Sequence, residues 1–312
     1  MRILRCSWDP PEAATALEEH LPEHEIVVGR PRQIPTLVGD ADVIVPARFR
    51  VDAVLLKRAK RCRLIQQMGA GVDMVDVNAA ESLGIPVANA PGDRTGNADS
   101  VAEMALWQVI ACRRRLPELT AAVRSGDWSA VPVTHSLHGA TVCIVGYGAI
   151  GSRLRELLRP FGCRVLAVRR SVPERAPDGV ELGSPADLPR FLGEADAVVL
   201  AVPLSDATRG MVDAGFLARM PPGSVLVNVS RAEIIDRDAL LSALRAGHLA
   251  TFGGDVFWTE PLDPQDPLMQ LPSVLTPHVA GLTLHTIQGG ARIVAENVRR
   301  LEAGEPLLYR IR

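Results

Sequence analysis

Cysteine and lysine are both scarce in this sequence of 312 residues. The 5 cysteines are an odd number, are widely spaced and include no Cys-x-x-Cys pair. This usage argues against a disulfide framework and a zinc site, and it favours a reducing compartment. Lys57 and Lys60 are the only lysines, which disfavours Schiff-base chemistry. We therefore predict no metal site and no lysine-based catalysis.

Long apolar runs and a strong excess of charge are also missing. No run approaches the ~18 apolar residues of a membrane-spanning helix. The start of the chain, Met1 to Cys6, is too short for a signal peptide and indicates a first strand. The net charge of −2 gives no reason to expect nucleic acid as a partner. We expect a cytoplasmic protein that binds neither nucleic acid nor a membrane.

The length of 312 residues predicts about two domains. The sequence is 47% hydrophobic and 22% charged, which is typical of a chain that buries sizeable cores. Residues 1 to 98 alternate short apolar runs with helical segments, which predicts a parallel sheet covered by helices. The predicted strands are 2–6, 25–28, 43–45, 64–67 and 86–89, and the predicted helices are 11–19, 51–58 and 75–83.

A glycine-rich turn lies near the middle of the chain. The buried strand 142–145 leads into Gly146, Gly148 and Gly151, in the spacing Gly-x-Gly-x-x-Gly, and a helical segment follows. In a dinucleotide-binding unit these glycines allow a tight turn, close approach of a pyrophosphate, and packing of helix on strand. A second strand, 164–168, comes at the expected distance. We predict a dinucleotide site; the competing interpretation is a glycine turn within an ordinary α/β domain.

Polar residues follow three of the later predicted strands. Arg231 follows the strand 224–229, Asp255 and Glu260 follow 250–254, and His278 follows 274–276. Ligands of open α/β sheets bind at the carboxyl ends of the strands. An arginine can grip a carboxylate, and a histidine beside a carboxylate can exchange a proton, so this set suits reduction of a carbonyl. Taken singly, each residue has a plainer interpretation: a surface arginine, a loop end, or a histidine satisfied by its surroundings.

Two long helices connect the parts of the chain. We predict one from Asp99 to Arg115, which bridges two domains, and a last helix from about Thr283 to Glu302, which returns to the first domain. The nucleotide domain would then be an insertion, with the active site between the domains. Trp128 lies outside any periodic segment; it either packs on its own domain or contacts a second copy.

Several ordered motifs resemble the D-isomer-specific 2-hydroxyacid dehydrogenases over nearly the whole length. The segments 228–236 and 254–261 resemble the family's arginine signature and the segment with its aspartate and glutamate. The segment 276–281 resembles its histidine segment, 69–73 its substrate-carboxylate loop, and 97–103 its entry into the bridging helix.

The resemblance implies a fold and two domains. We expect a Rossmann-type doubly wound parallel-sheet nucleotide domain, residues 99–283, inserted into a flavodoxin-like α/β substrate domain, residues 1–98 with 284–312. It further implies reduction of small 2-oxoacids, such as glyoxylate or hydroxypyruvate, to D-2-hydroxyacids, and a homodimer.

The resemblance also implies residue roles. Arg231 would bind and polarise the substrate, and His278 would be the general acid/base, paired with Glu260. The substrate would be bound by Ala70, Gly71, Asn97, Arg231 and His278. From the glycine motif, the resemblance and the residues after strand 164–168, we expect the cofactor to be bound by Gly146, Gly148, Ala149, Ile150, Gly151, Arg169, Arg170, Ser171, Val202, Pro203, Thr208, Val229, Ser230, Asp255, His278 and Gly281. Residues such as Arg48, Phe49, Trp258 and Leu282 could select the side chain accepted.

The sequence departs from the usual pattern at the end of the second nucleotide strand. Members that bind NAD usually have an acidic residue there, which accepts a hydrogen bond from the ribose 2′-hydroxyl. This chain has Arg169, Arg170 and Ser171, which suit a 2′-phosphate. We predict preference for NADP(H), with NAD(H) as the alternative cofactor; a solvated charge pair is the plainer interpretation. The chain ends soon after the last helix, so we expect no added regulatory domain of the kind found in many phosphoglycerate dehydrogenases.

Two other functions compete with this prediction. One is a relative that oxidises formate or phosphite; because formate dehydrogenases of this superfamily pair their histidine with glutamine, Glu260 argues against formate. The other is a non-catalytic, nucleotide-sensing protein similar to the corepressors of the superfamily. The complete set of Arg231, Glu260 and His278 favours an enzyme.

Overall fold

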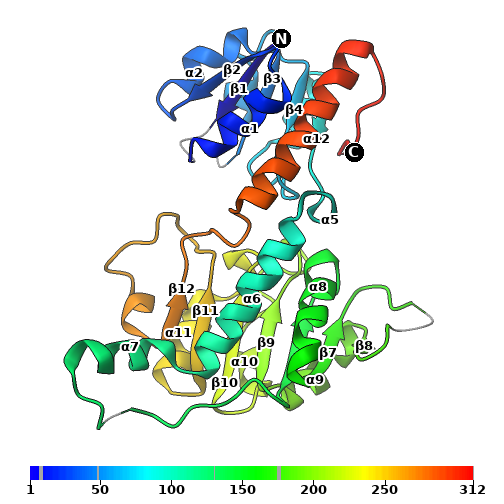
Figure 1. Cartoon of the computed structure of the whole chain (residues 1–312). Coiled ribbons are helices and arrows are strands. Elements are labelled where there is room, and N and C mark those ends of the chain that lie inside the picture. The colour runs from blue at the N-terminus through cyan, green and yellow to red at the C-terminus, as the bar shows by residue number, and fades with distance from the viewer. Residues whose placement is uncertain (7–9, 48, 130, 174–176, 312) are drawn as a thin grey trace. The chain divides into compact units, whose positions relative to one another are not determined.

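The computed structural model describes residues 1–6, 10–47, 49–129, 131–173 and 177–311. The chain divides into two compact units, Met1–Asn97 with Leu282–Arg312, and Ala98–Gly281. In each unit the strands of the sheet run parallel (Figure 1). The predicted α/β class is thereby confirmed.

The described residues of the first unit form a five-stranded sheet in the order β2-β1-β3-β4-β5. This is the flavodoxin-like order, in which the chain starts inside the sheet and reverses direction beside its first strand. The strands are β1 (Arg2–Cys6), β2 (Glu25–Gly29), β3 (Val43–Val45), β4 (Leu64–Gln66) and β5 (Val87–Ala88). The helices are α1 (Glu12–His20), α2 (Ile34–Leu37), η1 (Val38–Asp40), α3 (Ala53–Leu56), α4 (Val77–Ser82), α5 (Gly92–Thr95) and α12 (Leu284–Ala303).

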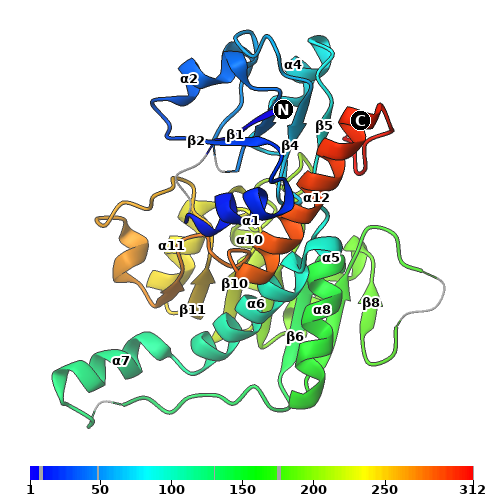
Figure 2. The ribbon, with the colours of Figure 1, turned by 45° about the horizontal axis from the view of Figure 1, so that its top comes forward.

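Both faces of this sheet are covered, which explains why its strands are apolar throughout. Alternate strand residues such as Ile3 and Val43 pack on one face against α1 and α12, and Leu4 and Ile44 pack on the other face against α2 and α3. Figure 2 shows α1 lying along α12. This alternation is the two-residue period of a strand between two helix layers.

Two helices of this unit begin later than the sequence predicts, for one reason. Val51 pairs with Val75 in an isolated parallel bridge, so neither residue is helical. Asp52 then caps α3, accepting from the Leu55 N–H at 2.9 Å, and Asp76 caps α4, accepting from the Ala79 N–H at 2.9 Å. The bridge and the two aspartates set where these helices begin.

The described residues of the second unit form a seven-stranded sheet in the order β12-β11-β10-β9-β6-β7-β8. Its strands are β6 (Thr141–Val145), β7 (Arg164–Val168), β8 (Glu181–Gly183), β9 (Ala197–Leu200), β10 (Ser224–Asn228), β11 (Leu249–Gly254) and β12 (Ser273–Leu275). Its helices are α6 (Asn97–Arg113), α7 (Leu116–Ser125), α8 (Ala149–Leu158), α9 (Leu188–Glu194), α10 (Ala214–Arg219) and α11 (Arg237–Arg245), with short 3₁₀ turns η2 (Arg159–Phe161), η3 (Pro185–Asp187), η4 (Ala232–Ile234) and η5 (Pro267–Gln270).

This order is that of a doubly wound dinucleotide-binding sheet, in which β7 and β8 lie on one side of β6 and the later strands lie on the other. Ile144 and Val199 face one core with α6 and α8, whereas Val145 and Leu200 face the opposite core with α9, α10 and α11. Figure 1 shows α6 and α8 on the same face of this sheet. The change of direction on either side of β6 places a ligand crevice at the carboxyl end of that strand.

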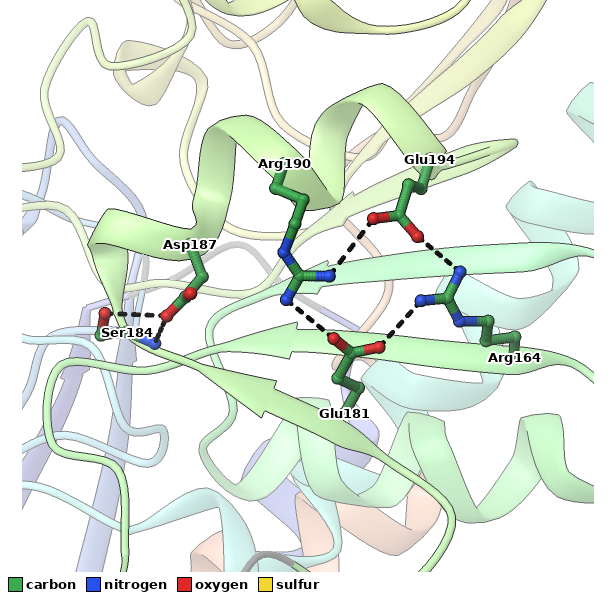
Figure 3. Close-up of polar contacts among 6 residues, drawn as sticks. All are labelled: Arg164, Glu181, Ser184, Asp187, Arg190 and Glu194. Atoms are coloured by element: carbon green, nitrogen blue, oxygen red, sulfur yellow. Dashed lines mark hydrogen bonds and ion pairs between the residues drawn. The ribbon is translucent and has the colours of Figure 1, made fainter.

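The edge strand β8 was not predicted from the hydrophobic pattern. A closed ring of four ion pairs links it to β7 and α9 (Figure 3). Arg164 contacts Glu181 at 2.8 Å and Glu194 at 2.5 Å, and Arg190 contacts the same two carboxylates at 2.7 and 3.2 Å. These contacts hold the pKa of both glutamates below the ordinary value, hydrogen bonds from the arginines being the main cause. The Arg169 N–H donates to Gly183 at 3.1 Å, so the fastened edge also fixes the end of β7.

Candidate active site

The glycine turn after β6 requires small residues at two positions and is open at the third. Gly146 has a φ of +108°, and a Cβ atom there would lie 2.5 Å from the Ala201 carbonyl oxygen. A Cβ on Gly151 would overlap the Gly146 carbonyl oxygen. Gly148 is exposed, has open space around it, and stands at the start of α8, a ten-residue helix. Open space therefore lies at the start of α8, where the first N–H groups of a helix have no partner within the helix and can bind a pyrophosphate.

The glycine turn leads into α8 and is tied to the end of β7. Ala149 is exposed and Ile150 is half-buried. The N–H groups of Gly146 and Tyr147 donate to the Val168 carbonyl at 3.0 and 3.1 Å, which ties the turn to the end of β7. The turn and the residues after β7 thus belong to one rigid corner of the second unit.

Three exposed residues follow β7 at this corner. Arg169, Arg170 and Ser171 point their exposed side chains away from the core, and the chain has no acidic residue at the end of this strand. A positive surface is therefore present where an acidic side chain would otherwise accept from a ribose hydroxyl.

Arg155 adds a further positive charge that the sequence pattern did not reveal. Burial raises the pKa of the Tyr147 phenol, while the charges of Arg155 and Arg169 both act to lower it, so both arginines lie near one phenol. A Cβ atom on Gly179 would lie 3.1 Å from Arg155 Nη2, so the loop before β8 passes beside this guanidinium. The sequence carries no signal for this, because the approach depends on the path of that loop.

The four strand-end residues of the second unit emerge at a single edge of the sheet. Arg231 follows β10, Asp255 follows β11, and His278 follows β12, and these strands are neighbours in that order (Figure 1). Because parallel strands have their carboxyl ends on the same side, the residues after them meet there. Glu260 lies on the loop after β11 and reaches His278 directly.

The structure joins His278 and Glu260 as a hydrogen-bonded pair. The Nδ1 atom of His278 lies 3.0 and 2.8 Å from the two carboxylate oxygens of Glu260. Glu260 is itself held by the Phe257 N–H, which donates to Oε1 at 3.0 Å. Both side chains are about one-third exposed, 34% for His278 and 35% for Glu260. The carboxylate orients the ring and favours an imidazole with its proton on Nδ1.

The backbone at His278 adopts the left-handed conformation, with a φ of +55°. This conformation is uncommon for a residue with a side chain and persists where the surroundings hold it. Asp255 stabilises this conformation, because its carboxylate accepts hydrogen bonds from the N–H groups of Val279 and Ala280, both at 2.9 Å. Asp255 is only 1% exposed, so its carboxylate lies inside the loop that carries His278.

The turn that carries Arg231 is fixed by a buried asparagine. Asn228 Nδ2 donates to the Arg231 carbonyl at 2.9 Å, and its Oδ1 accepts from the Ser230 N–H at 2.9 Å. The Ser230 hydroxyl donates to the Leu200 carbonyl at 3.2 Å, and Val229 and Ser230 are both buried. Arg231 Nη1 donates to the Ser230 carbonyl at 2.7 Å. The half-buried guanidinium thus stands on a rigid turn.

The remaining predicted residues lie on loops, except Asn97, which is the first residue of α6. In the second unit, Thr208 donates to the Pro203 carbonyl at 2.8 Å, next to Val202, and Gly281 is half-buried. In the first unit, the Ala70 carbonyl accepts from Asn89 at 2.7 Å, Gly71 follows it, and Asn97 begins α6. Trp258 donates to the Ile235 carbonyl at 3.2 Å. Phe49 and Leu282 are half-buried, and Arg48 lies outside the described residues.

Other kinds of site are absent from the part of the chain that the structure describes. None of its helices is long and apolar enough to cross a bilayer. Its histidines, cysteines and acidic residues form no group of three or more that could ligate a metal ion.

The sheet order, the glycine turn and the polar sheet edge define an α/β protein built for a dinucleotide. Residues 106–280 match the model of the NAD-binding domain of D-isomer specific 2-hydroxyacid dehydrogenases. The chain belongs to this family, as its motifs predicted.

Individual relatives agree with this assignment. A glyoxylate reductase of Korarchaeum cryptofilum is 33% identical over 95% of this chain and 91% of its own length. A D-3-phosphoglycerate dehydrogenase of Archaeoglobus fulgidus is 32% identical over 98% of this chain, which spans only 58% of that relative's length. Among solved structures, the TT0316 protein from Thermus thermophilus superposes with a TM-score of 0.87 at 32% identity, covering 100% of both chains.

Proposed function

We propose that this protein is an NADP(H)-preferring reductase that converts small 2-oxoacids, of the glyoxylate or hydroxypyruvate kind, to D-2-hydroxyacids. The observation that carries the proposal is the His278–Glu260 pair, at 2.8 Å, on the sheet edge where Arg231 also emerges. A proton donor and a guanidinium at one edge are what reduction of a 2-oxoacid needs. The second unit would hold the dinucleotide, and Ala70, Gly71 and Asn97 of the first unit would bind substrate.

The proposed cofactor site fits the residues present. Gly148 and the start of α8 would receive the pyrophosphate, and Arg169, Arg170 and Ser171 the 2′-phosphate; the charge of Arg155 acts on the same Tyr147 phenol as that of Arg169. When bound, a reduced nicotinamide supplies a hydride. The protein supplies orientation, charge complementarity and a proton.

The proposed proton transfer runs through His278. With Nδ1 turned to Glu260, Nε2 is the nitrogen that would deliver the proton to the carbonyl oxygen of the substrate. The Glu260 carboxylate holds the ring in this orientation through its hydrogen bond to Nδ1. Arg231 would bind the carboxylate and polarise the carbonyl with its fixed fork of N–H groups.

The direct experiment is a cofactor-oxidation assay with the purified protein. Loss of NADPH absorbance with glyoxylate or hydroxypyruvate supports the proposal. Turnover of formate or phosphite with oxidised cofactor would instead indicate a dehydrogenase that oxidises one of these substrates. Glu260 argues against formate, because formate dehydrogenases of this superfamily pair their histidine with glutamine. Tight dinucleotide binding without turnover of any of these substrates would indicate the non-catalytic alternative.

The first prediction concerns the choice of cofactor. A charge-assisted hydrogen bond contributes about 1.5–3 kcal/mol, so we expect kcat/KM for NADPH to exceed that for NADH by about ten-fold or more. The double variant Arg169→Asp/Arg170→Ser should lose this preference through a weaker kcat/KM with NADPH. Arg245, an exposed arginine at the end of α11, provides the control: Arg245→Asp should keep the preference. Equal or better kcat/KM with NADH in the unaltered protein would contradict this prediction.

The second prediction concerns the oligomeric state, and we propose a homodimer. The ten-residue helix α7 has no buried residue in the described chain. Val123 of this helix is 68% exposed, and Trp128 and Val133, which follow the helix, are 72% and 94% exposed, so Trp128 does not pack on its own unit. Exposed large apolar side chains that lie close together in the sequence favour an interaction surface on this segment.

Sedimentation at micromolar concentration tests the homodimer. We expect twice the chain mass of 33.5 kDa for the unaltered protein, and a shift toward monomer for Val123→Glu/Trp128→Glu. Val54 of α3, also 72% exposed, is the matched control, and Val54→Glu should remain dimeric. A monomer mass for the unaltered protein would rule out this surface as a stable interface.

A further inference from the structure

A glutamine lies fully buried in the core between α6 and the larger sheet. Gln108 is 0% exposed, within a helix whose neighbouring core residues are apolar. Gly253 of β11 lets the helix approach closely, because a Cβ atom there would lie 3.3 Å from Gln108 Cβ and 3.2 Å from Cys112 Sγ. A buried amide is costly unless its groups are paired, so its presence calls for an explanation.

The Gln108 amide begins a chain of hydrogen bonds that leads to the histidine loop. Its Nε2 donates to the Thr276 hydroxyl at 3.2 Å, and that hydroxyl donates to Asp255 Oδ1 at 2.6 Å. The same carboxylate accepts from the Val279 and Ala280 N–H groups. A hydroxyl has one proton to donate, so the donor from Gln108 directs the Thr276 proton to Asp255.

These contacts hold both sides of His278. Thr276 precedes it by two residues, and the His278 N–H donates to the Thr276 carbonyl at 2.9 Å. Val279 and Ala280 follow it directly and are fixed by Asp255. The left-handed backbone at His278 therefore stands between two anchored points that share one carboxylate. A misplacement of about 1 Å at a catalytic group can cost about 100-fold in rate.

We propose that Gln108 is a positioning residue that, through Thr276 and Asp255, fixes the loop that presents His278. The proposal rests on the proposed function, in which His278 is the proton donor. Gln108 touches no reacting atom; its effect reaches the reaction only through the geometry of the loop.

Replacement of Gln108 by methionine should lower activity without lowering stability. Within the described residues, no donor reaches the buried Oε1 atom of Gln108. Methionine has a similar shape and no such acceptor, so Gln108→Met removes an unpaired buried group along with the hydrogen bond to Thr276. If Gln108 served stability, Gln108→Met would be less stable than the unaltered protein. If Gln108 serves to position the loop, Gln108→Met should be at least as stable and should have a lower kcat.

The experiment compares Gln108→Met, Thr276→Val and Thr276→Ser with the unaltered full-length protein. We expect Gln108→Met to keep its Tm and its Kd for NADPH, and to lower kcat by about five- to ten-fold, the effect of one lost hydrogen bond. Thr276→Val, which removes the hydroxyl at constant shape, should lower kcat at least as much. Thr276→Ser, which restores the hydroxyl, should recover most of it.

Hydrogen–deuterium exchange separates this proposal from the proposed function. The amides of Val279 and Ala280 should exchange faster in Gln108→Met and Thr276→Val than in the unaltered protein or Thr276→Ser, whether or not any 2-oxoacid is reduced. Unchanged exchange in Gln108→Met overturns the positioning role, and so does a loss of kcat that matches a fall in Tm. Changed exchange in a protein that reduces no 2-oxoacid supports the loop contacts and contradicts the proposed function alone.

Discussion

Replacing His278 with asparagine should lower kcat for 2-oxoacid reduction by about 10²–10⁴-fold, the usual contribution of a general acid. Asparagine is the most informative replacement, because His278 has a φ of +55° and asparagine tolerates the left-handed conformation well. The loop should therefore keep its hydrogen bonds to Asp255, and the loss should reflect the missing proton donor. Alanine at the same position should lose at least as much and should be less stable.

The measurement is steady-state kinetics with NADPH and glyoxylate, beside a thermal melt of each variant. The matched control is His135→Asn, which makes the same substitution at an exposed histidine on the loop before β6. It should leave both kcat and Tm unchanged. A His278→Asn variant that retained near-normal kcat would remove His278 from the mechanism, while the dinucleotide turn at Gly146 to Gly151 would be unaffected.

Strand positions were the most predictable part of the fold, because buried parallel strands are continuous apolar runs. The bounds of β1, β3 and β7 are those that the sequence predicts. β8 was missed because Glu181, Leu182 and Gly183 contain a single large apolar residue, and this strand is held by the ion pairs of Arg164 and Arg190. α7 was missed because Pro117, a residue that usually marks the end of a helix, lies in the first turn of this one, and because none of its residues is buried. A strand held by ion pairs and a helix with no buried residue are both difficult to recognise from the hydrophobic pattern.

The meeting of His278 and Glu260 was predictable, since the carboxyl ends of parallel strands share one edge and the family pattern pairs the two residues. The surroundings of Asp255 were not. Its place after β11 indicated a residue at the sheet edge, yet its carboxylate is buried and engaged by three donors around His278. Gln108 gave no signal either, because a single polar residue in an apolar helix says nothing about which loop it reaches. Such contacts depend on how α6 crosses the sheet at Gly253.

Arg231→Ala should damage both substrate binding and turnover. A guanidinium that grips the carboxylate acts in the ground state, and one that polarises the carbonyl acts in the transition state, so KM should rise while kcat falls. Removal of a donor aimed at the developing oxyanion costs roughly 10²–10³-fold in kcat, and the weaker ground-state binding lowers kcat/KM further. The backbone of Arg231 is extended, with φ −141° and ψ 142°, and Asn228 bonds to its carbonyl, so alanine fits the turn.

Arg231→Lys separates charge from geometry at this position. Lysine keeps the positive charge but lacks the planar fork, and the two are not interchangeable where two oxygens must be held at once. We expect Arg231→Lys to recover some of the binding of the 2-oxoacid and little of kcat, and added guanidinium ion to restore part of the rate of Arg231→Ala. The Kd for NADPH, measured by fluorescence titration, should stay unchanged in both variants. If Arg231→Ala kept its KM and kcat, or lost only NADPH binding, the arginine would serve the cofactor and another residue would have to bind the 2-oxoacid.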